Sequence, residues 1–101
     1  MHNNEIAANI IGKRIKVKGA PFSFSENYLR GGTFAMEMDV GLIGWGSYAI
    51  GQNALCYMLR GDAKPSCSRF YTTPGGAITR VYLGREDQPL PVTIIGPTHL
   101  K

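Results

Sequence analysis

Two carboxylates, Glu37 and Asp39, have the types and spacing in this chain that best suit acid–base chemistry. They fall on the same face of a strand predicted over residues 33–40, which sets their Cβ atoms about 6–7 Å apart. That separation fits a carboxylate-based hydrolase or a hard-cation site. The opposite face of this strand is apolar and is expected to face the core. The two carboxylates would then be solvated charges on the outer face rather than a catalytic pair. Both histidines, His2 and His99, lie near the chain ends, where a general base is poorly held in position. We therefore predict a non-enzymatic protein with no catalytic residue, no metal site and no cofactor.

The two cysteines, Cys56 and Cys67, have a spacing that could support a disulfide bond. The segment between them contains Arg-Gly-Asp-Ala-Lys-Pro, which is typical of a hairpin loop with a strand on each side. If residues 55–59 pair antiparallel with residues 66–70, the cysteines lie opposite each other and a cross-strand disulfide fits. Two free buried thiols are the alternative, since the C-x10-C spacing matches neither a zinc site nor a redox C-x-x-C motif. A disulfide would imply an oxidising compartment.

A run of cations, Lys-Arg-Ile-Lys-Val-Lys, occupies residues 13–18. As a strand, this run places Arg14, Lys16 and Lys18 on one face and its two apolar residues on the other. The pattern predicts a solvated face or, as the functional alternative, a ridge that binds phosphate or another anion. The net charge of +4 permits an anionic partner such as nucleic acid without requiring one.

Aromatic side chains supply the other binding candidates. We take four of them as candidates for contact with a ligand or a protein partner: Trp45, Tyr48, Tyr71 and Tyr82. An overlapping set could stack on nucleic-acid bases if it were exposed beside the basic strand: Phe22, Phe24, Tyr28, Tyr71 and Tyr82. In a domain this small, however, most aromatic residues are expected to belong to the core.

The elements that must position these residues are one helix and a series of short strands. A helix is predicted over about residues 4–11, where Ile6 and Ile10 recur at helical spacing and Gly12 provides a stop. From about residue 13 to residue 95, alternating or apolar segments are separated by glycine and proline turns. The expected core residues are Phe34, Met36, Met38, Trp45, Leu55, Tyr57, Leu59, Phe70, Val81 and Leu83.

About eight strands at roughly ten-residue spacing are typical of an antiparallel meander, closed as a small barrel or folded as a sandwich. We therefore predict a single all-β domain over residues 1–101 with a short N-terminal helix. Eight strands close with side chains filling the interior, or enclose one small ligand. No apolar run approaches the ~20 residues of a membrane-spanning helix, so no membrane span is expected.

An ordered set of motifs resembles a group of small bacterial secreted proteins of unknown function. The motifs are Gly12-Lys13, Gly31-Gly32, Gly44-Trp45-Gly46, Leu55-Cys56 and Cys67. The resemblance implies an exported, lipocalin-like antiparallel meander in which Cys56 and Cys67 form the disulfide. It implies no catalytic residues. The chain departs from the pattern in having glycine on both sides of Trp45, which leaves the strand register there open.

Taken together, these features predict a non-enzymatic binding or interaction module of the bacterial cell envelope, with an unknown protein or small ligand as partner. The alternative is a cytoplasmic small β-barrel that binds nucleic acid or another anion through its basic strand. A homodimer also stays open. The opening Met-His-Asn-Asn-Glu lacks the basic and apolar regions of a signal peptide. We expect a periplasmic or extracellular protein if a signal peptide has been removed, and a cytoplasmic one otherwise.

Overall fold

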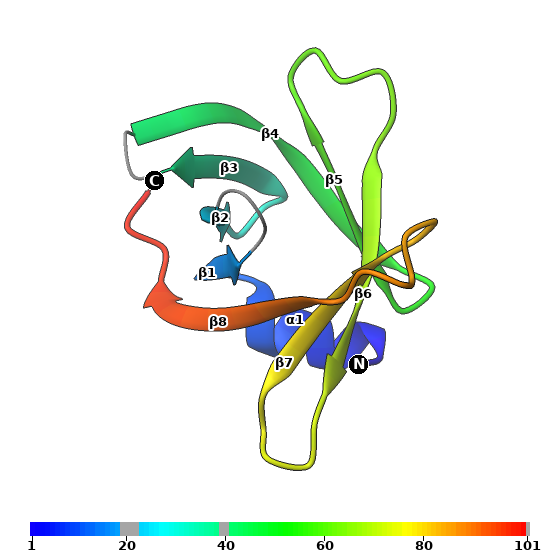
Figure 1. Ribbon diagram of the computed structural model, residues 1–101. Helices are drawn as coiled ribbons and strands as arrows, with labels where there is room; N and C mark the ends of the chain where they lie inside the picture. The colour runs from blue at the N-terminus through cyan, green and yellow to red at the C-terminus, as the bar shows by residue number, and fades with distance from the viewer. Residues whose placement is uncertain (19–22, 39–40, 101) are drawn as a thin grey trace.

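The computed structural model describes residues 1–18, 23–38 and 41–100, and its strands form a closed barrel with a short helix against one end (Figure 1). In chain order the elements are α1 (Asn3–Ile10), β1 (Lys13–Lys18), β2 (Ser23–Tyr28), β3 (Thr33–Met38), β4 (Gly41–Gly51), β5 (Ala54–Leu59), β6 (Ser66–Thr72), β7 (Ile78–Tyr82) and β8 (Leu90–Pro97). Each strand pairs antiparallel with the next, and β8 closes the barrel on β1. The predicted all-β meander with an N-terminal helix is confirmed, as a barrel rather than a sandwich.

Helix α1 is held by its packing on the barrel, because an isolated helix of this length is marginal in water. Ile6 and Ile10 are fully buried and belong to the same apolar cluster as the strands. A reciprocal pair of hydrogen bonds joins the helix to the turn between β4 and β5. The Asn3 N–H donates to Asn53 Oδ1 at 3.0 Å, and the Asn53 N–H donates to Asn3 Oδ1 at 2.6 Å.

The interior of the barrel is filled by side chains that alternate inward along the strands. The largest fully buried strand residues are Arg80, Tyr28, Phe34, Phe70, Ile15, Leu55, Glu26 and Val17. The Phe34 ring stacks on Tyr57 at a centroid distance of 4.4 Å and meets Tyr28 at 5.1 Å. The predicted core is confirmed at Phe34, Leu55, Tyr57 and Phe70, with Met36 and Leu59 packed against them.

The face of β7 that points into the barrel is not the one that its sequence pattern indicates. Val81 and Leu83 are predicted core residues, but Val81 pairs with the exposed Arg69, and Leu83 lies beyond the strand and is 45% exposed. Arg80 faces the interior instead and is fully buried. The reason is a long-range contact, because the buried carboxylate of Glu26 on β2 forms an ion pair with Arg80. Without that carboxylate, burying the arginine would be very costly.

Two further predicted core residues lie at the surface. Trp45 is only partly buried and lies opposite Ala35 in the β3–β4 ladder. Met38 is also partly exposed, and it lines a hollow at the end of β3. The positions on either side of Trp45 are Gly44 and Gly46, so this part of β4 has no side chain to place in the core.

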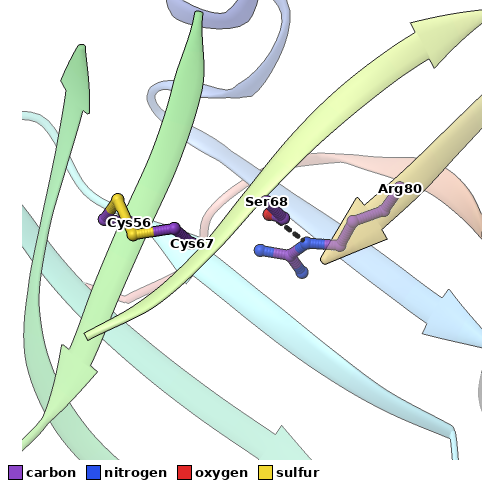
Figure 2. The surroundings of a disulfide bond; sticks show 4 residues. All are labelled: Cys56, Cys67, Ser68 and Arg80. Carbon is purple, nitrogen blue, oxygen red and sulfur yellow. Dashed lines mark hydrogen bonds between the residues drawn. A yellow bond between two sulfur atoms is a disulfide. The ribbon is translucent and has the colours of Figure 1, made fainter. Parts of the chain in front are cut away.

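A disulfide joins Cys56 and Cys67 on the outside of the barrel. The two residues are directly opposite in the β5–β6 ladder, with their Cα atoms 4.0 Å apart. Figure 2 shows that the disulfide lies on one side of β6 while Ser68 points to the other, toward Arg80. The predicted cross-strand disulfide is confirmed over the alternative of two free thiols. Closing a loop of this length stabilises the fold by about 3 kcal/mol, because it restricts the unfolded chain.

Candidate functional site

Trp45 lies between two hollows on the outside of the barrel, near the point where β5 ends. The larger one, here named the Trp45 hollow, has a volume of about 550 Å³ and is lined by Thr33, Trp45, Gly46, Ser47, Met58, Leu59, Arg60 and Gly61. The smaller one, the edge hollow, has about 330 Å³ and is lined by Ile43, Gly44, Trp45, Leu59, Arg60 and Asp62. Trp45, Leu59 and Arg60 border both hollows. An aromatic ring, an aliphatic side chain and a cation therefore come together at one place.

The outward position of Trp45 follows from a close approach of two strands at Gly46. Gly46 pairs with Leu59 of β5, and a Cβ added to it would lie 1.9 Å from the Met58 carbonyl oxygen and 2.7 Å from Leu59 Cα. Because both are backbone atoms, only glycine fits at this position. The neighbouring Trp45 points away from the interior, and its carbonyl accepts a hydrogen bond from the Arg60 N–H at 2.9 Å.

A β-bulge brings two more apolar side chains to the surface beside the tryptophan. The β3–β4 ladder shifts register between Met36 and Glu37, which leaves Ile43 as an extra residue on β4. Leu42 and Ile43 are consequently 50% and 49% exposed. From residue 40 to residue 59 the sequence contains no charged side chain. This uncharged stretch was the sequence signal for a contact surface, and the predicted site residues include only Trp45 and Tyr48 from it.

The other aromatic candidates lie away from these hollows. Tyr48 donates its hydroxyl to a backbone carbonyl at 2.7 Å and packs against the core. Tyr82 also packs on the core, with its hydroxyl oxygen 3.0 Å from that of Tyr57. Tyr71 is 51% exposed on β6. Of the four aromatic candidates, Trp45 is the one that borders the described hollows, so the structure does not bring the predicted set together.

The aromatic residues that could stack on bases do not gather beside the basic strand. Tyr28 is fully buried, and Tyr82 packs on the core. Phe24 packs partly against the same core and is the one aromatic candidate that lines a hollow with Arg14 and Lys16 among the described residues. Tyr71 lies on β6, which is not a neighbour of β1. Phe22 lies outside the described residues.

The cations of β1 share one face, as predicted, but an acidic residue lies among them. Arg14, Lys16 and Lys18 pair with alternate residues of β2. Arg14 and Lys16 line a third hollow of about 440 Å³, and Lys18 is not part of its described lining. Glu37 lines the same hollow, and its Oε1 lies 3.5 Å from Arg14 Nε. The carboxylate therefore neutralises part of the positive charge that an anion would need.

Glu37 has several partners of its own. Asn27 Nδ2 donates to its Oε1 at 2.7 Å, and His99 Nε2 lies 3.5 Å from its Oε2. Asp39, the second member of the proposed carboxylate pair, lies outside the described residues. Over residues 1–18, 23–38 and 41–100, no three His, Cys, Asp or Glu side chains come together as a metal site.

A buried polar cluster inside the barrel has no counterpart among the predicted site residues. Arg80 bonds to three side chains: Nη1 donates to Glu26 Oε1 at 2.5 Å, Nε to Ser68 Oγ at 2.8 Å and Nη2 to the Tyr28 hydroxyl at 3.0 Å. All four residues are fully buried, so the cluster is positioned to stabilise the fold rather than to meet a substrate. One sequence signal for this cluster is that Glu26 and Arg80 are each followed two positions later by a tyrosine, Tyr28 and Tyr82. In a strand these residues share a face with the charged ones.

The buried tyrosines predict a loss of stability in alkaline solution. Burial raises the pKa of Tyr28, Tyr57 and Tyr82, and the positive charge of Arg80 offsets only part of that effect. Above about pH 10 the unfolded chain ionises these tyrosines while the folded protein keeps their protons. The free energy of unfolding should therefore fall by about 1.4 kcal/mol per pH unit for each buried tyrosine. Urea unfolding between about pH 8 and pH 11 measures this, and a free energy that stays constant would contradict it.

No helix in the described part of the chain is both long and apolar enough to cross a membrane. Comparisons of the chain with protein-family models, with curated proteins and with solved structures found no match. The resemblance to small secreted lipocalin-like proteins therefore stays a prediction. The closed barrel and the disulfide are features of the structure itself.

Proposed function

We propose that the protein is a non-enzymatic binding module of the bacterial cell envelope that takes its ligand in the Trp45 hollow. The observation that carries this proposal is the convergence of Trp45, Leu59 and Arg60 on a hollow of about 550 Å³. The barrel interior is filled by its aromatic core and by the Arg80 cluster. A ligand is therefore better accommodated outside the barrel than in a central calyx.

The lining of the Trp45 hollow indicates the chemistry of the ligand. The indole of Trp45 offers a flat apolar surface for stacking. Arg60 is exposed, and its guanidinium can donate paired hydrogen bonds to a carboxylate, sulfonate or phosphate. The hydroxyls of Thr33 and Ser47 add polar contacts on the same wall. We infer a ligand with a flat apolar body and an acidic group.

The alternative of an anion- or nucleic-acid-binding barrel has weaker support. Glu37 lies 3.5 Å from Arg14 and reduces the positive charge of that face. Tyr28 and Tyr82 belong to the core instead of forming a stacking surface beside β1.

The envelope location is supported by the Cys56–Cys67 disulfide, because disulfides persist in oxidising compartments. Mass spectrometry of the protein purified from its own host, denatured without reductant, tests this. We expect the mass to be lower by the pair of hydrogens lost on oxidation. Two free thiols would instead support a cytoplasmic protein.

Binding can be tested with anilinonaphthalene sulfonate, a flat apolar probe that carries an acidic group. Trp45 is the single tryptophan of the chain, so energy transfer from it to the probe reports binding to the protein, and substitutions at the hollow locate the site. We expect Arg60→Ala to weaken binding about tenfold, which corresponds to about 1.4 kcal/mol, because a charge-assisted hydrogen bond is lost.

The matched control is Arg85→Ala, which removes an exposed arginine from the loop between β7 and β8. This control should bind the probe as the wild type does. Equal affinities of the wild type and Arg60→Ala would count against the Trp45 hollow.

A further inference from the structure

Part of β4 extends beyond its pairing with β5 and has a free edge. The β4–β5 ladder begins at Gly46, opposite Leu59. The Arg60 N–H still bonds to the Trp45 carbonyl, and the chain then turns at Gly61, where φ is 97°. Residues 41–44 pair with β3 on one side, and no described strand pairs with them on the other. Figure 1 shows this half of β4 arching away from the β5–β6 hairpin.

This edge lacks the usual protection against pairing with another chain. Exposed edges are normally blocked by lysine, by proline or by charged side chains, whereas the edge here reads Gly41-Leu42-Ile43-Gly44. The bulge at Ile43 is the one protective device present, and it limits pairing to a short stretch. Leu42 and Ile43 are each about half exposed, so association would cover apolar surface as well as backbone groups.

We propose that residues 41–44 pair with the same residues of a second copy of this chain, antiparallel and about a two-fold axis. An axis between Leu42 and Ile43 sets each leucine opposite the isoleucine of the other copy and each Gly41 opposite Gly44. The edge is thus complementary to itself, as a two-fold interface requires. This inference does not require the ligand proposed for the Trp45 hollow, and the two sites share Trp45, Leu59 and Arg60.

Charge favours a second copy over an acidic partner at this edge. Each chain carries a net charge of +4, so two copies repel each other across most of their surfaces. Residues 40–59 contain no charged side chain, and the hollow beside the edge is lined by one cation, Arg60, and one anion, Asp62. Two copies that meet here therefore bring together balanced charges. An acidic partner would meet Asp62 as well as Arg60 beside this edge, so its charge would not be matched by a surface of one sign.

The dimer would cover the edge hollow, which shares Trp45, Leu59 and Arg60 with the Trp45 hollow. Ile43 and Gly44 line the edge hollow, whereas the Trp45 hollow is lined from β3, β5 and the following turn as well as from β4. Self-association and ligand binding can therefore be separated by substitution.

Sedimentation velocity over a range of concentrations tests the proposal. We expect the wild type to dimerise and Ile43→Lys to weaken the association at least about tenfold, because each lysine would lie opposite the apolar Leu42 of the other copy and two like charges would meet at the centre of the edge. Leu83→Lys is the matched control, since Leu83 is 45% exposed and lies outside the strands. It should dimerise as the wild type does.

A wild type that is monomeric up to about 1 mM would overturn the proposal, and so would an Ile43→Lys variant that dimerises as the wild type does. Thermal melting of Ile43→Lys checks that it is folded. Titration of this variant with anilinonaphthalene sulfonate keeps the two proposals apart. If Ile43→Lys no longer dimerises but still binds the probe, the result supports self-pairing at the edge. If a folded, monomeric Ile43→Lys also fails to bind the probe, the edge and the Trp45 hollow form one site, and the proposal of a separate edge is overturned.

Discussion

Arg80→Ala is expected to lower the free energy of unfolding by about 3–5 kcal/mol, because it leaves the Glu26 carboxylate buried and unpaired. Glu26 is fully buried, and its Oε2 has no hydrogen-bond partner among the described residues even with Arg80 in place. The arginine also packs against aromatic rings, with its guanidinium carbon 4.8 Å from the Tyr82 ring centroid and 5.1 Å from that of Phe70. A small domain has only about 5–15 kcal/mol in total, so much of the stability would be lost. Urea unfolding measures the difference.

A double substitution separates the charge from the packing at this cluster. Arg80→Met combined with Glu26→Leu removes both charges and keeps most of the buried volume, so it should recover part of the stability lost in Arg80→Ala. The recovery is partial because the buried hydroxyls of Tyr28 and Ser68 lose their hydrogen bonds to this pair. Arg69→Ala is the control on the neighbouring strand, where the side chain is exposed, and it should change the free energy by no more than about 0.5 kcal/mol. A loss of under about 1 kcal/mol in Arg80→Ala would mean that the ion pair does not hold the barrel together.

Gly46→Ala is expected to destabilise the protein by about 3 kcal/mol or more, at or above the upper end of the usual cost of overpacking. Its methyl group would lie 1.9 Å from the Met58 carbonyl oxygen. Since that atom belongs to the backbone, β4 and β5 would have to separate locally. The hydrogen bond between the Trp45 carbonyl and the Arg60 N–H would be disturbed as well.

The matched control for this substitution is Gly44→Ala. A Cβ at Gly44 would meet only the end of the Leu59 side chain, at 3.6 Å, which is an ordinary contact. Thermal melting of the two variants should therefore differ clearly, with Gly44→Ala close to the wild type. Similar melting temperatures for both would show that the strands at Gly46 can move apart at little cost.

The parts of the fold that depend on neighbouring residues could be predicted from the sequence. The helix expected over residues 4–11 is observed at Asn3–Ile10, because its apolar spacing and the following glycine are local signals. The hairpin register that places Cys56 opposite Cys67 is also local, since it depends on one loop. These features need no knowledge of the rest of the chain.

The parts that depend on distant contacts could not be predicted. The inward face of β7 is decided by Glu26, which lies far from Arg80 in the sequence. The outward position of Trp45 is decided by the approach of the β5 backbone to Gly46. Trp45 borders both hollows and stays a predicted binding candidate, while its predicted place in the core is wrong. The hollows beside it arise where β5 ends, which no pattern within β4 indicates.

The position of the disulfide makes closure of the barrel depend on the chemistry of its surroundings. The β5–β6 ladder is one of the two shortest, with pairs only at Leu55–Ser68, Cys56–Cys67 and Tyr57–Ser66. The disulfide thus joins two strands that few backbone hydrogen bonds hold together. In a reducing compartment the disulfide would be lost. If β5 and β6 then separated, two new strand edges would be exposed to proteases and to other chains. The bond that stabilises the closed barrel under oxidising conditions would thus leave the β5–β6 ladder as its weakest point under reducing conditions.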